Sequence, residues 1–283
     1  MFRCGRMSVC RRRGTTNPIV IYYNHQSQVV NPKWVRAMGN ERCEIRIGTS
    51  GWHYDHWIGR FYPEKMPKDR WLEYYARQFD TVEINNTFYH LPREQTMVNW
   101  HDRVPAHFLF AVKASRYITH VKKLKDPQES VQRFFELADL LKRRLGPILY
   151  QLPPTLHKDL ERLDTFIACL PKRNHAVFEF RHSSWYEQDT FDLLHRRDVA
   201  LCVHDLGGAA PPRVVTGGMV YVRFHGTDGR YAGNYPDHVL QDWADWMKSQ
   251  RGAVRAIYAY FNNDVSGHAL NNARTLKQIM GLT

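Results

Sequence analysis

Eight short segments of the chain share one pattern, in which apolar or β-branched residues come first and polar residues close the segment. Each segment has the length of a β-strand, and longer stretches of helical character separate them. This alternation predicts an α/β fold, namely a single (β/α)8 barrel of the TIM type over residues 44–283. The strand-like segments are Ile45–Trp52, Thr81–Tyr89, Phe108–Ser115, Ile148–Leu152, Ala176–His182, Ala200–Asp205, Met219–Gly226 and Arg255–Asn263.

Seven of the connecting segments show the spacing of amphipathic helices. In Pro127–Leu145, for example, Val131, Phe135 and Ala138 recur at three- and four-residue steps. The segment Leu206–Gly218 contains two Gly-Gly pairs and a Pro-Pro pair, so we expect one degenerate crossover, without a full helix, between the sixth and seventh strands. The expected helices are Lys68–Phe79, Glu94–Asp102, Pro127–Leu145, Leu156–Leu170, Tyr186–Arg197, Asp237–Arg251 and Ser266–Met280.

Side chains alternate between the two faces of a strand, so the apolar face that packs on helices identifies the face that points into the barrel. The sixth strand is ambiguous, because one face carries Leu201, Val203 and Asp205 and the other carries Ala200, Cys202 and His204. We assign Asp205 to the mouth of the barrel. The other residues expected to face inward near the mouth are Glu83, Asn85, Lys113, Glu179, Arg181, Arg223, His225, Tyr260 and Asn262.

The predicted mouth therefore holds three carboxylates and three permanent cations. Burying such charges is costly unless they pair, so one interpretation is an ion-pair network that only specifies strand register. We favour a ligand site, because barrels built for stability alone fill this space with Val, Ile and Leu. In barrels of this type the chemistry lies at the shared carboxyl ends of the strands.

These residue types favour acid–base chemistry on an anionic substrate. A carboxyl group near a second carboxylate and an apolar wall has a raised pKa and can donate a proton, so the catalytic candidates are Glu83, Glu179, His225 and Asp205. Arginine suits bidentate contacts with phosphate or carboxylate. The substrate-binding candidates are Ser50, Trp52, Asn85, Lys113, Gln151, Arg181, Arg223, Arg230, Tyr260 and Asn262, of which Arg230 lies in a glycine-rich segment suited to phosphate.

A metal site built from the carboxylates and His225 is the alternative chemistry. The three cations already balance the three carboxylates, and the chain has no His-X-His pair. We therefore expect neither a metal nor another cofactor.

Charge and cysteine content bear on partners and compartment. The formal net charge is +12, and residues 1–43 contribute +7 of it, with eight Lys or Arg residues against Glu41. We expect a basic leader over residues 1–43, poorly ordered over 1–37, with Met38 as a second position where translation can start. Five cysteines without ligand-like spacing favour free thiols in the cytoplasm. No apolar stretch reaches the ~20 residues of a membrane span.

Several motifs resemble a known family. They are IGTSGW at 47–52, VEINNTFY at 82–89, FAVKAS at 110–115, QLPP at 151–154, EFRHSSW at 179–185, YVRFHG at 221–226 and YFNN at 260–263. Together they look like the YecE-like family, a bacterial family of unknown function, across the whole predicted barrel. The resemblance implies a (β/α)8 barrel and supplies no reaction. Some members have been likened to barrel endonucleases that act on damaged DNA, but the clustered histidine ligands of those enzymes are missing from the strand ends here.

Two functional hypotheses from different classes follow. The first is an enzyme that acts on a phosphorylated or carboxylated small molecule by metal-independent acid–base chemistry at the mouth. The alternative is a nucleic-acid-binding barrel with a role related to DNA repair, because a basic chain attracts polyanions. A non-catalytic ligand sensor or scaffold is the remaining interpretation.

Overall fold

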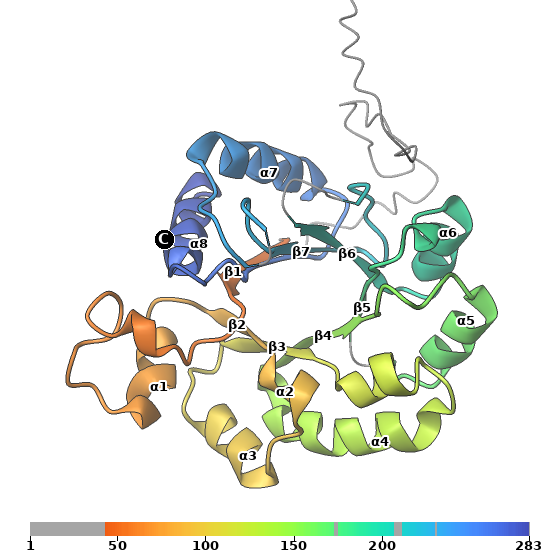
Figure 1. Ribbon diagram of the computed structural model, residues 1–283, viewed down its shortest axis with the longest axis horizontal. Coiled ribbons are helices and arrows are strands. Elements are labelled where there is room, and N and C mark those ends of the chain that lie inside the picture. The colour runs from red at the N-terminus through yellow and green to blue at the C-terminus, as the bar shows by residue number, and fades with distance from the viewer. Residues whose placement is uncertain (1–42, 173–174, 207–210, 230, 283) are drawn as a thin grey trace, which may run out of the picture.

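Eight parallel strands form the inner layer of the protein, and helices surround them (Figure 1). The computed structural model describes residues 43–172, 175–206, 211–229 and 231–282. Neighbouring strands are hydrogen bonded in the order β1-β8-β7-β6-β5-β4-β3-β2, so the predicted α/β barrel of TIM type is confirmed. The strands are β1 (Glu44–Thr49), β2 (Thr81–Ile84), β3 (Leu109–Lys113), β4 (Leu145–Gln151), β5 (Ala176–Glu179), β6 (Ala200–Asp205), β7 (Met219–Phe224) and β8 (Ala256–Phe261). The predicted leader, apart from Cys43, lies outside the described residues.

The helices lie on the outside of the barrel and near its rim. They are α1 (Trp71–Tyr75), α2 (Asn86–Tyr89), α3 (Glu94–Asp102), α4 (Pro127–Ala138), α5 (Leu160–Ala168), α6 (Gln188–Arg196), α7 (Asp237–Gln250) and α8 (His268–Ile279). In the described part of the crossover between β6 and β7 there is no helix, as predicted, while residues 207–210 lie outside the description. None of the described helices combines the length and the apolar character that a bilayer crossing requires.

Several predicted elements were too long, and two of them show the reason. The strand expected over Thr81–Tyr89 ends at Ile84, because Asn85 adopts a helical conformation (φ −101°, ψ −22°) and α2 follows at once. The helix expected over Pro127–Leu145 ends at Ala138 and continues as a 3₁₀ turn. Both segments kept an apolar pattern beyond the point where the backbone changed, so pattern alone overestimated their length.

Two layers of apolar packing identify the inward face of each strand. The larger layer fills the space between strands and helices, and includes Leu201 and Val203 of β6. The smaller layer fills the barrel itself with aliphatic residues, a cysteine, a methionine and tyrosines: Ala111, Leu149, Val177, Ala200, Cys202, Met219, Tyr221, Ala256, Tyr258 and Tyr260. Because Ala200 and Cys202 point inward, His204 is the inward residue at the end of β6. The assignment of Asp205 to the inside was therefore wrong.

The barrel closes between β1 and β2, which stand at the two ends of the hydrogen-bonded order. Tyr75 of α1 places its hydroxyl between these strands: it accepts from the Thr49 backbone N–H at 3.0 Å and donates to the Thr81 carbonyl at 3.2 Å. Near the mouth, an isolated bridge pairs Ser50 with Glu83. The Tyr75 side chain thus replaces part of the ladder here. Both residues of the bridge, Ser50 and Glu83, are predicted site residues.

Candidate active site at the barrel mouth

Arg223 of β7 lies across the barrel between two carboxylates. Its Nη2 donates to Glu83 Oε1 of β2 at 2.7 Å, and its Nη1 donates to Glu179 Oε2 of β5 at 2.6 Å. All three residues are almost fully buried, with Arg223 only 1% exposed. We call Glu83, Glu179 and Arg223 the paired cluster. It ties three strands together beneath the mouth.

Hydrogen bonds engage both oxygens of Glu83. Ser50 Oγ donates to Oε1 and the Tyr221 hydroxyl donates to Oε2, each at 2.7 Å. Burial alone would raise the pKa of Glu83, but the Arg223 guanidinium and these donors outweigh burial and lower it. Glu83 is therefore an ionised carboxylate with both oxygens hydrogen bonded.

Glu179 is held in the same way. Besides Arg223, the Arg181 guanidinium forms an ion pair with its Oε1, and His225 Nε2 lies 3.4 Å from that oxygen. Burial opposes ionisation, yet Arg181 and Arg223 keep the pKa of Glu179 well below its usual value. The expectation that Glu83 or Glu179 has a raised pKa was therefore wrong, because the cations that sequence analysis placed nearby bind these carboxylates directly.

His225 is a buried acceptor beneath the mouth. Its Nε2 lies 2.9 Å from Arg181 Nη2 and 3.4 Å from Arg223 Nη1, and a guanidinium can only donate. Burial and the charge of Arg223 lower the pKa of His225 to about 4, so the ring is neutral near pH 7. Its Nδ1 lies beside the Asn262 amide at 3.3 Å. His225 is 0% exposed, which places it behind Arg181 and away from a bound substrate.

Lys113, at the end of β3, differs from these groups. It is 7% exposed, and its Nζ has no hydrogen bond or ion pair with any described residue. The face of the Phe88 ring lies 4.1 Å from the Nζ. Burial, and then the charge of Arg223, lower the pKa of Lys113 to about 7, against the opposing effect of the two carboxylates. Near neutral pH much of this lysine is a free amine.

Two further nitrogen groups on the same side of the mouth also lack partners. His204 Nδ1 of β6 and Arg181 Nε, just after β5, are buried without a hydrogen bond. Burial lowers the pKa of His204 to about 3, so this ring is neutral. The Arg181 side chain keeps 15% of its surface exposed. We call Lys113, His204 and the outer side of Arg181 the open edge, which lies over β3 to β6.

The remaining predicted site residues occupy different places. Gln151 ends β4 between the strands of the open edge and is half-buried. Asn85 Oδ1 accepts a hydrogen bond from Arg223 Nη2 at 3.4 Å. Asp205 instead faces Tyr235 on the outer side of the barrel, where burial and this carboxylate raise the pKa of the tyrosine.

Two predicted residues do not reach the mouth. Tyr260 is 0% exposed, and its hydroxyl lies 2.6 Å from Thr81 Oγ1 below Glu83. Trp52 packs against Trp100 of α3 at a ring distance of 5.2 Å and against Phe110 on the outer face of β3. Both were placed in the site because of their position near strand ends. Their rings instead pack in the core, and the ring of Trp52 also lines the cavity described below.

Two contributors, His204 and Tyr221, were not among the predicted site residues, although the alternation of the seventh strand turns Tyr221 inward. Residue size could not have identified His204, because the barrel interior also accepts Leu149 and Tyr221. The inward direction of His204 follows only from the packing of Ala200 and Cys202 in the interior. No local signal could have identified Tyr221 as a partner of Glu83, which lies 138 positions earlier in the chain.

The glycine-rich segment after β7 folds back on itself. Gly226 has φ +109°, and a Cβ there would lie 1.9 Å from the Ala232 carbonyl oxygen, so glycine is needed for this close approach. Its N–H donates to the Tyr235 hydroxyl, and the Tyr231 N–H donates to the His225 carbonyl. These backbone donors are used within the loop and are not presented to a phosphate. Arg230 lies outside the described residues.

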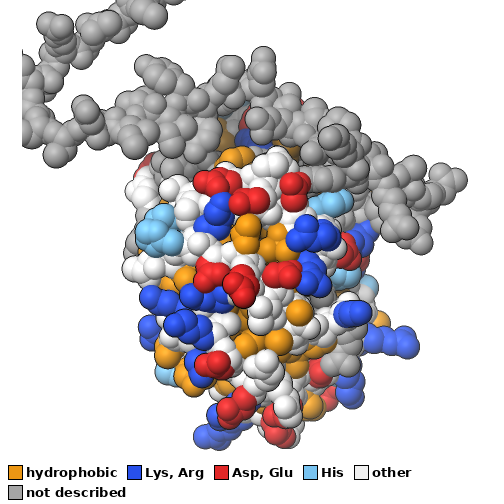
Figure 2. Space-filling view, turned by 90° about the vertical axis from the view of Figure 1, so that its right-hand side faces the viewer, with side chains coloured by type: hydrophobic (Ala, Val, Ile, Leu, Met, Phe, Trp, Pro, Cys, Tyr) orange, Lys and Arg blue, Asp and Glu red, His pale blue; other side chains and the backbone are white. Residues whose placement is uncertain are grey.

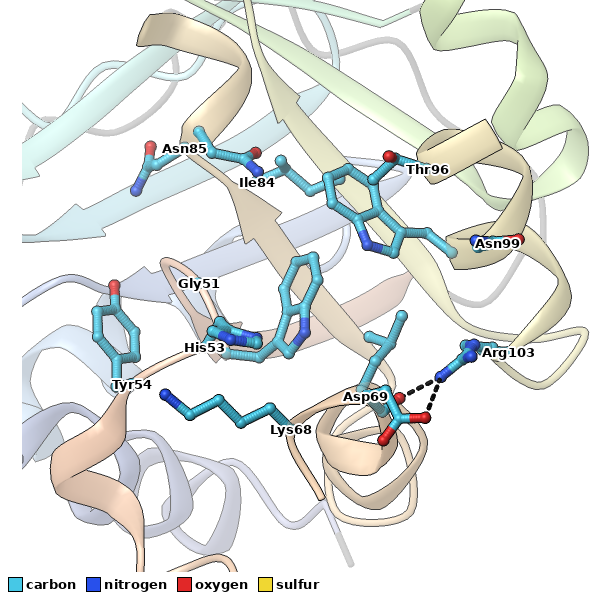
Figure 3. Close-up of a pocket in the computed structure, with 14 residues that line it drawn as sticks. Gly51, His53, Tyr54, Lys68, Asp69, Ile84, Asn85, Thr96, Asn99 and Arg103 are labelled. Atoms are coloured by element: carbon cyan, nitrogen blue, oxygen red, sulfur yellow. Dashed lines mark hydrogen bonds and ion pairs between the residues drawn. The ribbon is translucent and has the colours of Figure 1, made fainter. Parts of the chain in front are cut away.

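A cavity of about 490 Å³ lies beside the mouth, between the loop after β1 and α3 (Figure 3). Its lining combines His53 and Tyr54 with the amides Asn85 and Asn99, and Figure 3 shows Arg103 turned toward Asp69 at its edge. One of its lining residues, Asn85, contacts Arg223 of the paired cluster. It offers room for part of a ligand but none of the groups of the open edge.

The carboxylate oxygens of the mouth are poorly available to a metal. Within the described ranges, no three His, Cys, Asp or Glu side chains come together in a way that could hold an ion. Glu83 and Glu179 receive guanidinium donors instead, and a divalent cation would sit beside Arg181 and Arg223. Cys202 is fully buried and its pKa is raised well above the usual value by burial, so it is an inert thiol.

The outer surface over α5 and α6 mixes charges of both signs. Figure 2 shows acidic and basic side chains interspersed on this face. Arg197 pairs with Asp164 at 2.6 Å and Lys158 with Asp189 at 2.8 Å. The described residues of this face thus form no basic stripe of the kind that tracks a nucleic-acid backbone.

Comparison with known proteins agrees with this architecture. A family model described as "Protein of unknown function DUF72" matches residues 46–283. The UPF0759 protein YunF of Bacillus subtilis is 24% identical over 84% of this chain and 95% of its own length, and the UPF0759 protein YecE of Escherichia coli is 29% identical over 57% and 59%. The crystal structure of a DUF72 family protein from Thermotoga maritima superposes with a TM-score of 0.77, at 29% identity over 84% of this chain and 99% of that one.

Proposed function

The chain belongs to the DUF72 family of proteins of unknown function, as its resemblance to the YecE-like family predicted, and we propose that it is an enzyme that acts on a small anionic substrate by metal-independent acid–base chemistry at the barrel mouth. In this proposal Lys113 is the group that exchanges protons near neutral pH, and the open side of Arg181 holds a phosphate or carboxylate of the substrate. Glu83, Glu179 and His225 position these two residues and do not touch the substrate.

The unpaired state of Lys113 is the observation that carries the proposal. A buried lysine kept for stability would have a carboxylate partner, since an unpaired buried ion costs several kcal/mol. Here both nearby carboxylates bind arginines. An acid–base catalyst works best when its pKa lies near the operating pH, and burial beside Arg223 lowers the pKa of Lys113 to about 7.

Arg181 supports the anionic character of the substrate. One side of its guanidinium binds Glu179, while the side chain keeps 15% of its surface exposed. Arginine can bind a second oxyanion with the donors that remain. The paired cluster carries a net charge of −1, which Arg181 balances. The charge that an anion at the open edge would balance is therefore that of a protonated Lys113.

The carboxylates of the mouth already accept hydrogen bonds from protein groups, and this supports a reaction without a metal. Glu83 and Glu179, the best hard ligands at the mouth, accept hydrogen bonds from Arg223 and from neutral donors such as Tyr221. Recruiting them to a cation would leave the Arg223 guanidinium buried without a partner.

A thermal-shift comparison of the full chain tests the proposal. We would compare inorganic phosphate, lactate and ribose phosphate with the neutral compounds glycerol and ribose. A ligand that binds only the native state raises the melting temperature, by an amount that grows with its concentration relative to Kd. We expect the anions to raise the melting temperature and the neutral compounds to leave it unchanged.

Two variants test whether Arg181 is the residue through which anions raise the melting temperature. Arg181→Gln should abolish the shift, whereas Arg197→Gln, which removes the same charge at the far end of the barrel, should preserve it. A shift that survives Arg181→Gln would show that the anion binds elsewhere and would refute the proposal. A shift seen only with oligonucleotides and erased by salt would favour the nucleic-acid alternative.

A further inference from the structure

We propose that Lys113 condenses with a carbonyl group of the substrate to form an imine, so that the substrate is an oxo acid or a phosphorylated oxo compound. This inference rests on the function proposed above and narrows its substrate class. It assigns Lys113 a covalent role at the carbonyl carbon, next to the anionic group held by Arg181.

The surroundings of Lys113 favour an uncharged, reactive amine. The guanidinium of Arg223 repels its protonated form, and burial removes the water that would stabilise the charge. Lysine becomes a nucleophile in proteins when it is desolvated or lies next to another cation, and both conditions hold here. A carboxylate salt bridge would instead keep the ammonium form, and none reaches Lys113 from the described residues.

The geometry also leaves a path to the amine. Phe88 covers one side of the Nζ at 4.1 Å, while the lysine remains 7% exposed at the carboxyl end of β3. Arg181 lies on the same open edge, two strands away, and is close enough to influence the pKa of Lys113. We therefore infer that the anionic group of the substrate lies at Arg181 while its carbonyl group lies at Lys113.

The proposed step balances without an oxidant or a reductant. The neutral amine attacks the carbonyl carbon, a C–N bond forms, and the electron pair of the C=O double bond moves to the oxygen. The resulting carbinolamine loses its oxygen as water, together with the two hydrogens of the amine. The products are one imine and one water molecule, and a proton taken up by the imine nitrogen makes it a stronger electron sink.

Borohydride trapping tests this step on the full chain. The protein would be incubated with glyoxylate or pyruvate, reduced with sodium borohydride, and digested for peptide mass mapping. Reduction converts an imine into a stable secondary amine, whose mass identifies the modified lysine. We expect Lys113 to be labelled roughly tenfold or more faster than exposed lysines such as Lys125 near pH 7, because a larger share of it is uncharged. Lactate, which matches pyruvate in charge and lacks the carbonyl, should give no adduct.

The pH dependence gives a second signature. Arg223, Arg181, Glu179, Glu83 and His120 are the charged or titratable groups that face Lys113. With these neighbours in place, the rate of labelling at Lys113 should rise through about pH 7 and then level off, since the amine is then fully deprotonated. Labelling of exposed lysines should continue to rise up to about pH 10.

Lys113→Met should remove the fast adduct and leave slow labelling of the other lysines unchanged. Labelling of Lys113 no faster than that of Lys125 would overturn the imine. If the anions still raised the melting temperature through Arg181, the proposed function would survive that failure. If neither the anion shift nor the adduct appeared, both proposals would be wrong.

Discussion

The two sides of the barrel mouth treat charge in opposite ways. In the paired cluster, Arg223 binds Glu83 and Glu179 with short hydrogen bonds, and the three groups are shielded from solvent. On the open edge, Lys113 has no ionic partner, and His204 Nδ1 and Arg181 Nε have no hydrogen bond among the described residues. The barrel mouth thus contains buried charges that are fully paired, and beside them polar groups that lack a partner among the described residues.

This difference distinguishes charged groups that hold the strands together from charged groups that are available to a ligand. A buried ion pair with complete hydrogen bonding can specify how strands pack against each other, and its members are fully occupied. An unpaired buried amine lowers stability, and such groups persist where they are used. The ion-pair network that we first set aside as a register device describes the paired cluster well. We propose that the open edge is the ligand site that we favoured.

The largest effect should come from breaking the paired cluster. Glu83→Ala leaves Arg223 with one carboxylate and removes the partner of Ser50 and Tyr221, so we expect a loss of about 3–5 kcal/mol in the free energy of unfolding. Urea denaturation measures this loss. The matched change Glu73→Ala, which breaks the partly exposed pair with Arg70, should cost less than about 1 kcal/mol. Equal losses would mean that burial does not distinguish the two pairs.

Removing the unpaired amine should have the opposite sign. The folded state lowers the pKa of Lys113 to about 7, so below that pH the native protein bears the full cost of a buried charge. Lys113→Met should therefore raise the free energy of unfolding by about 3 kcal/mol near pH 6. The gain should shrink by up to about 1.4 kcal/mol per pH unit above pH 7, as the native lysine becomes neutral.

Urea denaturation near pH 6 and near pH 9 would reveal this trend. Lys125→Met, a change of the same type at an exposed position, should alter stability little at either pH. A destabilised Lys113→Met variant would show that the lysine contributes to the fold, and would remove the contrast between the two sides of the mouth.

A smaller effect should follow from removing one neutral donor. Tyr221→Phe deletes the hydrogen bond to Glu83 Oε2, and a hydrogen bond to a charged group contributes roughly 1.5–3 kcal/mol. The control is Tyr150→Phe, because the buried Tyr150 hydroxyl has no partner among the described residues. That change should be neutral or slightly stabilising. Similar costs for the two changes would mean that the network around Glu83 has no special weight.

The smallest effect is expected at His204. Its Nδ1 makes no hydrogen bond, so His204→Leu should change the free energy of unfolding by less than about 1 kcal/mol. His225→Leu is the comparison, because it removes the acceptor at 2.9 Å from Arg181 Nη2 and should cost more. Chemical denaturation of both variants would decide whether the open edge is as dispensable for stability as its missing partners indicate.

Much of this site could be located from the sequence. The larger apolar residues of β5 and β7 face the helices, and their alternation correctly turned Glu179 and Arg223 inward. The alternation of apolar and polar residues did not predict the inward face of β6, because both faces of that strand carry apolar residues. It also did not predict the end of β2, where Asn85 leaves the strand conformation. In each case the local pattern continued while the backbone or the packing partner changed.

The sequence by itself determined the eight strands, the shared mouth and most of the charged residues found there, because periodicity along a strand is a local property. Only the tertiary structure decided which charges pair. Glu83 and Arg223 stand 140 positions apart and meet because the barrel closes between them. That closure placed the carboxylates against arginines and left Lys113 without a partner, which reversed the roles expected of them: the glutamates became structural anions, and the lysine became the candidate reactive group.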